Sequence, residues 1–454
     1  MASNERLFVM PQDVIPALKT MDTGAPRRPS QSDLDLKHRL HRKLLERINL
    51  DRLVEIDAPR VRHEVRAALV ALVAEEEDAS PSDHDGEVVD QVLNEVFGLG
   101  PLEPLMEDPT ISDILVTTPK LVYVERAGKL VKTEVQFKDN AHLQRIIQKI
   151  VSQAGRRIDE SSPMVDARLP DGSRVNAVIA PVAVDGPLLS IRRFSREVLQ
   201  AQDLVAAGGL TQQMMDFLEA CVRSRLNILI AGGTGTGKTT LLNVLSAFIP
   251  ADERIVTIED TAELQLRQEH VARMESRPSN LEGEGAIKER QLLINSLRMR
   301  PDRIIIGEVR GDEALDMLQA MNTGHDGSLA TIHANTCRDA VNRLELMVSL
   351  ANSSLSQPTI RRQIVAAIDV FVQVARLSDG TRRITEIAEA LGVKDDEVEI
   401  RELFAFEHLG VAEGGHVEGR FCVAGVKPKF LAKLKRTNRG FSETIFDPLV
   451  GAAS

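Results

Sequence analysis

The chain has 454 residues, more than one ordinary domain, so we expect two or three domains. Its net charge of −11 and its aromatic content of 3% argue against a general nucleic-acid-binding surface. Its three cysteines form no Cys-x-x-Cys pair and support neither a disulfide framework nor a cysteine-rich zinc site. We find no signal peptide in Met1–Met10 and no apolar run of about 18 residues, so we expect a soluble, cytoplasmic protein.

The first 85 residues divide into a tail, a helical module and a linker. Residues 1–35 have the composition of a flexible tail. Residues 36–85 contain apolar residues at helical spacing, namely Leu40, Leu44, Ile48, Val61, Val65, Leu69 and Leu72. They predict either a small helical module or an amphipathic arm that packs on the chain's own next domain. The acidic run 75–85 reads as a solvated linker.

Residues 86–200 alternate short strands and helices. Apolar spacing predicts helices around 88–96 and 143–151. Strands are expected at 113–116, 121–125 and 130–137, with further strands on both sides of a turn at Pro170–Gly172. This region is expected to be an α+β domain.

Residues 201–454 have the texture of an α/β domain. Buried strands are expected at 227–231, 255–258, 304–306 and 328–332, with helical patterns between them. This order predicts a parallel sheet covered by helices on both faces. The stretch 398–446 is rich in strand-forming residues but carries no motif that assigns it.

The strongest motif follows the first of these strands. It reads Gly232-Gly233-Thr234-Gly235-Thr236-Gly237-Lys238-Thr239 and fits the phosphate-binding pattern G-x-x-x-x-G-K-[ST]. The glycines let backbone N–H groups point at phosphates, Lys238 supplies a charge to the β- and γ-phosphates, and the Thr239 hydroxyl binds Mg²⁺. Because an apolar strand precedes the loop and a helical pattern follows it, a glycine turn without a ligand is a weak alternative.

Carboxylates end two of the other strands. Glu308 ends the strand 304–306, and beside a P-loop it is expected to serve Mg²⁺ and water. Glu259 ends the strand 255–258 and is a candidate to orient or deprotonate the attacking water, although a helix cap or loop acid is an equal alternative.

Two histidines and four arginines complete the candidates. His325 and His333 lie at either end of the strand 328–332; alone, each favours a structural histidine over a nucleotide contact, and no third ligand supports zinc. Arginines cluster near the boundary between the two domains, at Arg168, Arg174, Arg192 and Arg193. A solvated face is one interpretation; an arginine finger that stabilises the transferred phosphoryl group is the other.

Taken together, these residues resemble the type II/IV secretion ATPase superfamily, and specifically the CpaF family of Tad-type pilus motors. The resemblance covers Glu87 to Asp447 and depends on four boxes in order. They are the P-loop, the Asp box Thr257–Glu263, the Walker B stretch Arg300–Gly311 and the His box Thr323–Asn335. The stretches 169–176 and 190–194 and the long N-terminal extension point to the CpaF subfamily.

The resemblance implies a RecA-like P-loop ATPase domain with a parallel-rich sheet over 201–454, preceded by a PAS-like α+β domain over 86–200. It implies a cytoplasmic homo-hexamer at the inner face of the inner membrane, which hydrolyses Mg²⁺-ATP to drive pilus assembly or retraction, or secretion, through a membrane platform protein. It assigns catalysis to Glu259, Glu308 and His333, and to the arginines Arg174, Arg192 and Arg193. The metal ligands are Thr239 and Glu308. The nucleotide-binding residues are Gly232, Gly233, Thr234, Gly235, Thr236, Gly237, Lys238, Thr239 and Thr240.

Two other functions compete with the motor. A RecA-like nucleic-acid translocase would need a basic strand-binding surface, which the composition disfavours, so no nucleic-acid partner is expected. A nucleotide sensor without turnover is disfavoured by the two well-placed glutamates.

Overall fold

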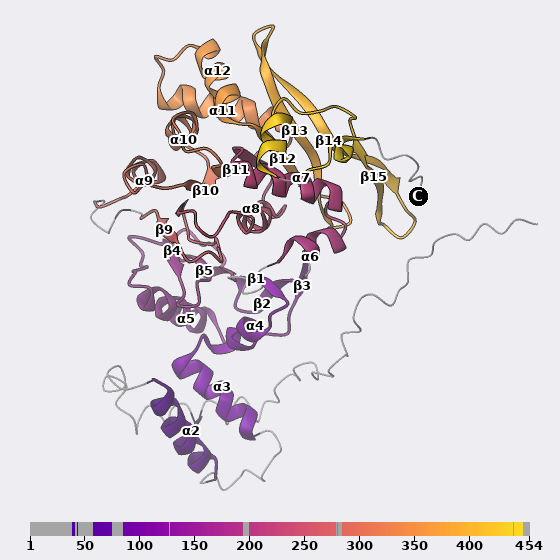
Figure 1. The fold of residues 1–454 in the computed structure, drawn as a ribbon. Helices are drawn as coiled ribbons and strands as arrows, with labels where there is room; N and C mark the ends of the chain where they lie inside the picture. Colours follow the sequence, from indigo (N-terminus) through magenta and orange to yellow (C-terminus); the bar gives the residue numbers. More distant parts are fainter. Residues whose placement is uncertain are drawn as a thin grey trace, which may run out of the picture. The chain divides into compact units, whose positions relative to one another are not determined.

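The computed structural model describes residues 39–40, 43, 58–74, 85–126, 128–193, 199–277, 279, 284–438 and 440–447 (Figure 1). The chain divides into two compact units, one up to Phe194 and one from Ser195 onward. The predicted tail over 1–35, Leu44, Ile48 and all but the last residue of the predicted acidic linker lie outside the described residues.

The first unit begins with a pair of packed helices, α2 (Ala58–Ala74) and α3 (Asp85–Phe97). Both follow the apolar spacing seen in the sequence. Their shared core buries one face of each helix together with Leu40, and it consists of Val65, Leu69, Leu72, Val73, Val88, Val89, Val92 and Leu93. A short 3₁₀ turn, Gly100–Leu102, and helix α4 (Glu103–Glu107) follow.

A six-stranded antiparallel sheet forms the rest of this unit, in the order β3-β2-β1-β6-β5-β4. Its strands are β1 (Ile111–Thr118), β2 (Leu121–Arg126), β3 (Lys129–Lys132), β4 (Met164–Arg168), β5 (Arg174–Val178) and β6 (Leu188–Arg192). Helix α5 (Asn140–Gln153) packs its apolar stripe on one face of the sheet, and Asp139 caps its first turn.

The third strand is shorter than the sequence predicted. It ends at Lys132 rather than at Phe137. The Thr133 N–H and hydroxyl both donate to the carbonyl of Val122, and the hydroxyl also accepts from the N–H of Val135, which closes a local turn at the end of the strand. Phe137 is buried in the core that α5 covers, which draws the backbone out of the sheet plane.

The second unit contains a nine-stranded sheet in the order β15-β14-β13-β12-β7-β11-β10-β8-β9. Six neighbouring strands are parallel: β12 (Val370–Arg376), β7 (Ile228–Gly232), β11 (Leu329–Ile332), β10 (Arg303–Val309), β8 (Ile255–Glu259) and β9 (Val271–Glu275). The four predicted strands are therefore confirmed. The strands β9 and β12 were not predicted, because β9 is a half-polar edge strand and β12 directly follows a helix.

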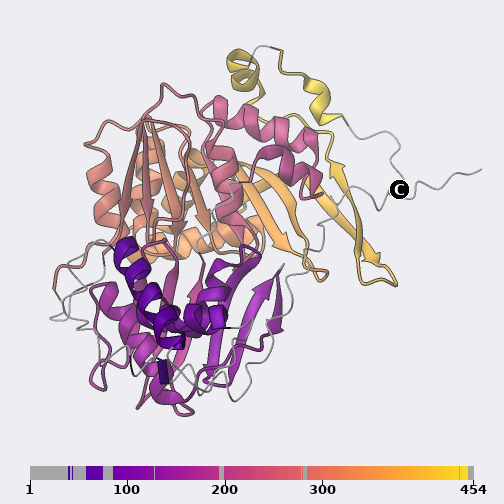
Figure 2. The same cartoon turned by 90° about the horizontal axis from the view of Figure 1, so that it is seen from below.

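Helices cover both faces of this sheet (Figure 2). Alternate residues of β7 enter opposite cores: Ile228 and Ile230 join one core, and Leu229 and Ala231 join the other. The first core includes α7 (Gln212–Arg223) and α8 (Lys238–Ser246), with α6 (Ala201–Ala206) packed against it. The second includes α9 (Glu289–Ser296), α10 (Glu313–Asn322), α11 (Cys337–Ala351) and α12 (Gln357–Ala367).

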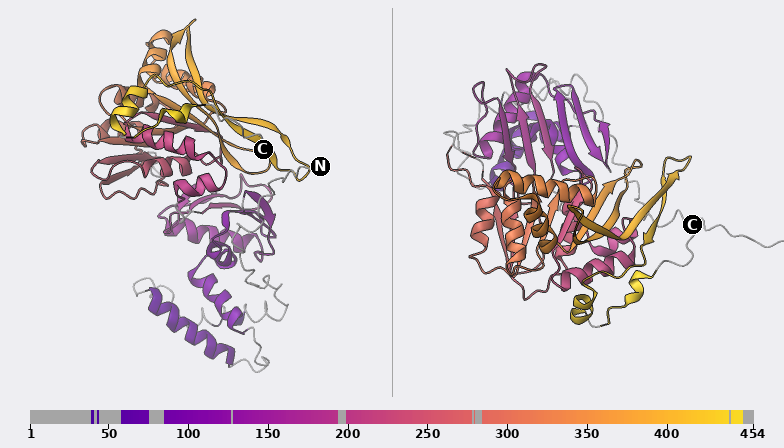
Figure 3. Two further views of the ribbon diagram at one scale, coloured as in Figure 1. Left: turned by 45° about the vertical axis from the view of Figure 1, so that its right-hand side comes forward. Right: turned by 90° about the horizontal axis from the view of Figure 1, so that it is seen from above.

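Three antiparallel strands extend the sheet, and the last two fall largely in the stretch 398–446 that the sequence left unassigned. These are β13 (Arg382–Lys394), β14 (Glu397–Val411) and β15 (Val417–Val423), drawn in orange and yellow in Figure 3. Helix α13 (Leu431–Thr437) and the turn Glu443–Phe446 follow. Phe404 of β14 packs against Phe217 of α7 and Phe446, so the extension shares the core of the parallel half.

The strand order identifies the fold. The strand that precedes the P-loop, β7, lies inside the sheet, and β11 separates it from the acidic strand β10. This arrangement, with helices on both faces, is a RecA-like α/β fold, as the sequence predicted. Within the described residues, no helix is both long and apolar enough to cross a membrane.

Candidate functional site

The P-loop joins β7 to α8. Gly235 and Gly237 adopt φ values of +71° and +99°, which side chains other than glycine rarely tolerate. Gly237 is the N-cap residue of α8, so the backbone N–H groups of the first helical turn are available to an anion. At Gly232, a Cβ would lie 2.5 Å from the carbonyl oxygen of Val374 on β12, so only glycine fits this strand end.

Lys238 is folded over this loop. Its side chain is buried, and its Nζ donates to the carbonyl oxygen of Gly233 at 2.8 Å. The Thr236 hydroxyl donates to the same oxygen at 3.0 Å. Burial lowers the pKa of the Lys238 ammonium, while the charge of Glu308 opposes that shift. Thr239 and Thr240, next in the helix, remain partly exposed.

Glu308 and His333 lie together at the carboxyl ends of two neighbouring strands. Glu308 is in β10, His333 follows β11, and Glu308 Oε1 lies 2.7 Å from His333 Nε2. Burial and the charge of Lys238 lower the pKa of His333, although Glu308 raises it. At neutral pH the imidazole is therefore neutral, and its Nε2–H donates to the carboxylate. The structure thus brings together Lys238, Glu308 and His333, which the sequence separates by up to 95 positions (333 minus 238).

Glu259 ends β8 and is only 2% exposed. Its Oε2 accepts hydrogen bonds from the N–H groups of Glu263 and Leu264, both at 2.7 Å. Burial raises the pKa of this carboxyl group, while those two N–H groups lower it. A Cβ on Gly307 would come within 3.1 Å of the Glu259 Cγ, so the glycine of β10 leaves room for this side chain. In this structure Glu259 therefore holds the loop that follows β8. Its role in orienting the attacking water stays a prediction.

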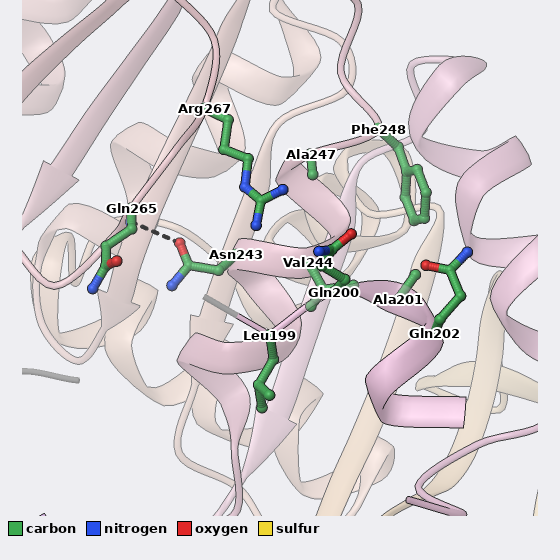
Figure 4. Close-up of a pocket in the computed structure, with 10 residues that line it drawn as sticks. All are labelled: Leu199, Gln200, Ala201, Gln202, Asn243, Val244, Ala247, Phe248, Gln265 and Arg267. Atoms are coloured by element: carbon green, nitrogen blue, oxygen red, sulfur yellow. Dashed lines mark hydrogen bonds between the residues drawn. The ribbon is translucent and has the colours of Figure 1, made fainter. Parts of the chain in front are cut away.

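The segment after Glu259 is also tied to the P-loop helix. Asn243 Oδ1 of α8 accepts from the N–H of Gln265 at 2.9 Å, a bond drawn as a dashed line in Figure 4. A cavity of about 140 Å³ lies between this segment, α6 and the later turns of α8. Its lining includes Gln200, Phe248 and Arg267 but no residue of the P-loop (Figure 4). It is therefore separate from the phosphate-binding loop.

The arginines of the first unit form a row. Arg168, Arg174 and Arg192 are directly opposite one another on β4, β5 and β6, and so share one face of that sheet. The row faces away from the core, because the alternate residues of β5 and β6 are the buried ones. On β1, Asp113 is the next partner in register, and its Oδ1 lies 3.1 Å from Arg192 Nε.

Arg193 binds backbone carbonyl groups. Its guanidinium donates to the backbone carbonyls of Asp108 and Ile111, which ties the end of β6 to the start of β1. Asp166 accepts a hydrogen bond from the Asn176 side chain, and Asp171 accepts one from the Ser173 hydroxyl. The pairing of Arg192 with Asp113 had no local sequence signal.

Two residues beside the P-loop were also not predicted. Gln373 of β12 is buried and donates to the carbonyl oxygen of Ala334 at 3.2 Å, which links β12 to the loop that carries His333. Arg382 of β13 donates from Nε to the carbonyl oxygen of Gly235 at 2.9 Å. Neither lies in a recognisable motif; only the pairing of β12 with β7 and β13 brings them here.

The chain is similar to known proteins over much of its length. Residues 95–430 match the family model described as "Type II/IV secretion system protein". A protein of Mycobacterium tuberculosis named for conjugal transfer is 40% identical over 300 residues, which span 65% of this chain and 85% of that protein. The conjugal transfer protein TrbB of Rhizobium radiobacter is 32% identical, over 69% of this chain and 92% of that protein.

A solved structure matches a similar share of the chain. The crystal structure of the VirB11 ATPase from the Brucella suis type IV secretion system, in complex with sulphate, is 31% identical. The match covers 65% of this chain and 97% of that chain, with a TM-score of 0.36. Since the family model spans well over half of the sequence, the chain belongs to the type II/IV secretion system protein family.

Proposed function

We propose that this chain is an ATPase motor that hydrolyses Mg²⁺-ATP at the P-loop. The observation that carries the proposal is the convergence of Lys238, Glu308 and His333 beside the loop. The loop offers backbone N–H groups and a buried lysine to the phosphates. The neighbouring strand ends offer a carboxylate and a neutral imidazole where the γ-phosphate of a bound nucleotide would be attacked.

The residues present fit Mg²⁺. Thr239 contributes a partly exposed hydroxyl in the first turn of α8, and Glu308 contributes a carboxylate that interacts with Lys238 in the same site. Oxygen ligands of this kind suit Mg²⁺. The ion, when bound, would neutralise charge on the transferred phosphoryl group.

The remaining roles are assigned as proposals. Glu259, whose pKa burial raises, is suited to take a proton from the attacking water once its loop contacts loosen. His333 holds Glu308 through the Nε2–H bond. Arg174, Arg192 and Arg193 would act on the γ-phosphate from the first unit; Arg192, whose side chain is 57% exposed beside Asp113, supports this role best.

We also propose the biological setting. The relatives are named for conjugal transfer and for type IV secretion, which supports a motor for secretion or pilus work. The sequence marks of the CpaF family favour a Tad-type pilus motor. On this proposal the protein is a homo-hexamer at the cytoplasmic face of the inner membrane and acts on a platform protein there. A PAS-like domain over 86–200 and a RecA-like ATPase domain over 201–454 would move relative to one another during turnover.

The test is ATP turnover by the purified full-length chain with Mg²⁺, with EDTA, and with the Lys238→Ala variant. Turnover only in the first condition supports the proposal; equal phosphate release in all three contradicts it. Adding single-stranded DNA separates the competing function, since a nucleic-acid translocase would be stimulated several-fold and a secretion motor would not.

A further inference from the structure

Arg382 lies along the outside of the P-loop. It is the first residue of β13, and its side chain is exposed. Its Nε donates to the carbonyl oxygen of Gly235 at 2.9 Å, and its Cδ would be 3.4 Å from a Cβ placed on Gly237. The stem of the side chain is therefore packed on the loop, while the terminal amino groups extend beyond the anchored Nε.

The fold holds this arginine firmly in place. Strand β12 pairs with β7 up to Gly232, and β13 returns beside β12 with Arg382 opposite Arg376. Asp379 closes the connecting turn by accepting from the N–H and the hydroxyl of Thr381, at 2.9 and 2.6 Å. Its other oxygen accepts from the N–H of Val417 at 2.9 Å. The hydroxyl of Thr381 and these N–H groups hold the pKa of Asp379 down to about 2, so the turn is fixed at all ordinary pH values.

Two other cations of this unit face a carboxylate. Arg310 is paired with Asp260, and Lys238 interacts with the charge of Glu308. Across the part of the chain that the structure describes, Arg382 has no such ion pair. An uncompensated guanidinium is thus held beside a loop whose glycines and helix N-terminus are built to bind phosphate.

We propose that Arg382 is a second phosphate-binding cation of the nucleotide site. Its Nε stays on Gly235, and its terminal amino groups bind the phosphate chain of ADP or ATP. This inference depends on the proposed function, because it requires that the P-loop binds nucleotide. It differs from a role in loop shape alone, for which the bond to Gly235 would suffice and the charge would not matter.

The experiment measures the dissociation constant of fluorescent ADP for the full-length protein at low and at high KCl. The variants are Arg382→Ala, Lys238→Ala and the matched control Arg383→Ala, whose guanidinium is instead stacked 4.6 Å above the Phe406 ring. ADP is used so that hydrolysis does not complicate the reading. A charge-assisted hydrogen bond predicts that Arg382→Ala weakens ADP binding about tenfold or more at low salt. The deficit should shrink as KCl screens the lost charge, and Arg383→Ala should match the parent protein.

Two results would overturn the inference. The first is ADP binding by Arg382→Ala that equals the parent at both salt concentrations. The second is a deficit of the same size at every salt concentration, which would assign the side chain to the shape of the loop. Failure of the proposed function has a different result: the parent protein itself would not bind ADP, or Lys238→Ala would bind it and hydrolyse ATP as the parent does.

Discussion

The two ends of strand β10 carry charged side chains in opposite circumstances. Arg303, at its start, is fully buried, and its guanidinium donates to Glu253 and to the carbonyl oxygens of Gly327 and Val222. Glu308, near its end, has a side chain that is 27% exposed and is bonded to a titratable histidine. A buried pair surrounded by fixed acceptors has no capacity left for a ligand. A partly exposed pair beside a P-loop retains that capacity, so one end serves stability and the other serves chemistry.

The largest effect is expected from Glu253→Gln at the start of β10. The change leaves Arg303 buried without its carboxylate, and removing one partner of a buried pair costs about 3–5 kcal/mol. We expect the free energy of unfolding, measured in urea, to fall by that amount. The double variant Glu253→Leu/Arg303→Met should recover most of the loss, because an apolar pair needs no charge partner. A Glu253→Gln protein as stable as the parent would show that the start of β10 is not the structural end.

Lys238 begins α8 and lies beside Glu308. Lys238→Ala should leave the unfolding midpoint nearly unchanged and reduce ATP turnover to background. The loss is expected to be about 10²–10³-fold or more, because the variant lacks the P-loop cation that faces the developing charge. Steady-state phosphate release measures it. The control is Lys433→Ala, which removes a lysine of the same unit that donates to the carbonyl of Arg225 and should keep full turnover. Normal turnover in Lys238→Ala would remove the P-loop from the mechanism.

Sequence alone was sufficient to locate the candidate boxes along the chain, because each is continuous and adjoins an apolar strand. Lys238, Glu259, Glu308 and His333 all lie in the second unit at these strand ends. Sequence could not supply the contacts between boxes. The pairing of Glu308 with His333 requires that β10 and β11 be neighbours, and the approach of Arg382 to Gly235 requires the antiparallel return of β13.

The strands of the fold could be predicted from sequence only where they are continuous apolar runs. Fully buried strands such as β7 and β8 are short apolar runs that stand out in the sequence. The edge strand β9 has no buried residue, and the long strands β13 and β14 mix buried residues with partly and fully exposed ones, so none of them stands out as a short apolar run. Arg303 shows the same limit, because a buried arginine next to an apolar strand is read from sequence as a surface residue until its partners are known.

The two carboxylates of the site, Glu259 and Glu308, are expected to act in turnover and not in nucleotide binding. Glu308→Gln and Glu259→Gln should each lower turnover by about 10²–10⁴-fold, the range expected when a group that handles protons in the transition state is lost. ATP binding should persist, because the P-loop contacts remain. Nucleotide affinity and single-turnover hydrolysis measure the two effects, and Glu269→Gln, an exposed acid of the same segment, is the control. Loss of binding in both variants would mean that they build the site; normal turnover in Glu259→Gln would place the base elsewhere.

A smaller effect is expected from the first unit. Arg174→Ala and Arg192→Ala should each lower turnover about 10- to 100-fold, the size of one charge-assisted hydrogen bond, while ADP affinity stays nearly unchanged because ADP lacks the γ-phosphate. The kcat of each variant measures the loss of turnover, and the dissociation constant of ADP measures whether nucleotide binding is kept. Asp113→Asn is the matched variant for Arg192: it frees the guanidinium and should cost far less turnover. Equal loss of ATP and ADP binding, or a lowered thermal midpoint, would show that the row only stabilises the sheet.

The smallest effect concerns the pH dependence of stability at Glu259. Burial raises the pKa of its carboxyl group in the folded state above the usual value, so the folded protein binds this proton more tightly than the unfolded chain does. The stability that this group contributes is therefore complete below its unfolded pKa and is lost as pH rises through the folded pKa. Glu259→Gln imitates the protonated form and does not titrate. The variant should consequently gain stability relative to the parent as pH rises above the usual carboxyl pKa, by a fraction of the loss caused by Glu253→Gln.

Urea midpoints at several pH values measure this difference, with Glu269→Gln as a control that should show no trend. The opposite slope would mean that the N–H groups of Glu263 and Leu264, which favour the charged carboxylate, outweigh burial. That outcome would bear on mechanism, because a carboxylate stabilised in its charged form is a poor acceptor for a proton from water. A raised pKa instead makes Glu259 a better acceptor for that proton. The sign of the slope therefore decides whether this buried acid belongs with Arg303 among the structural charges or with Glu308 among the reactive ones.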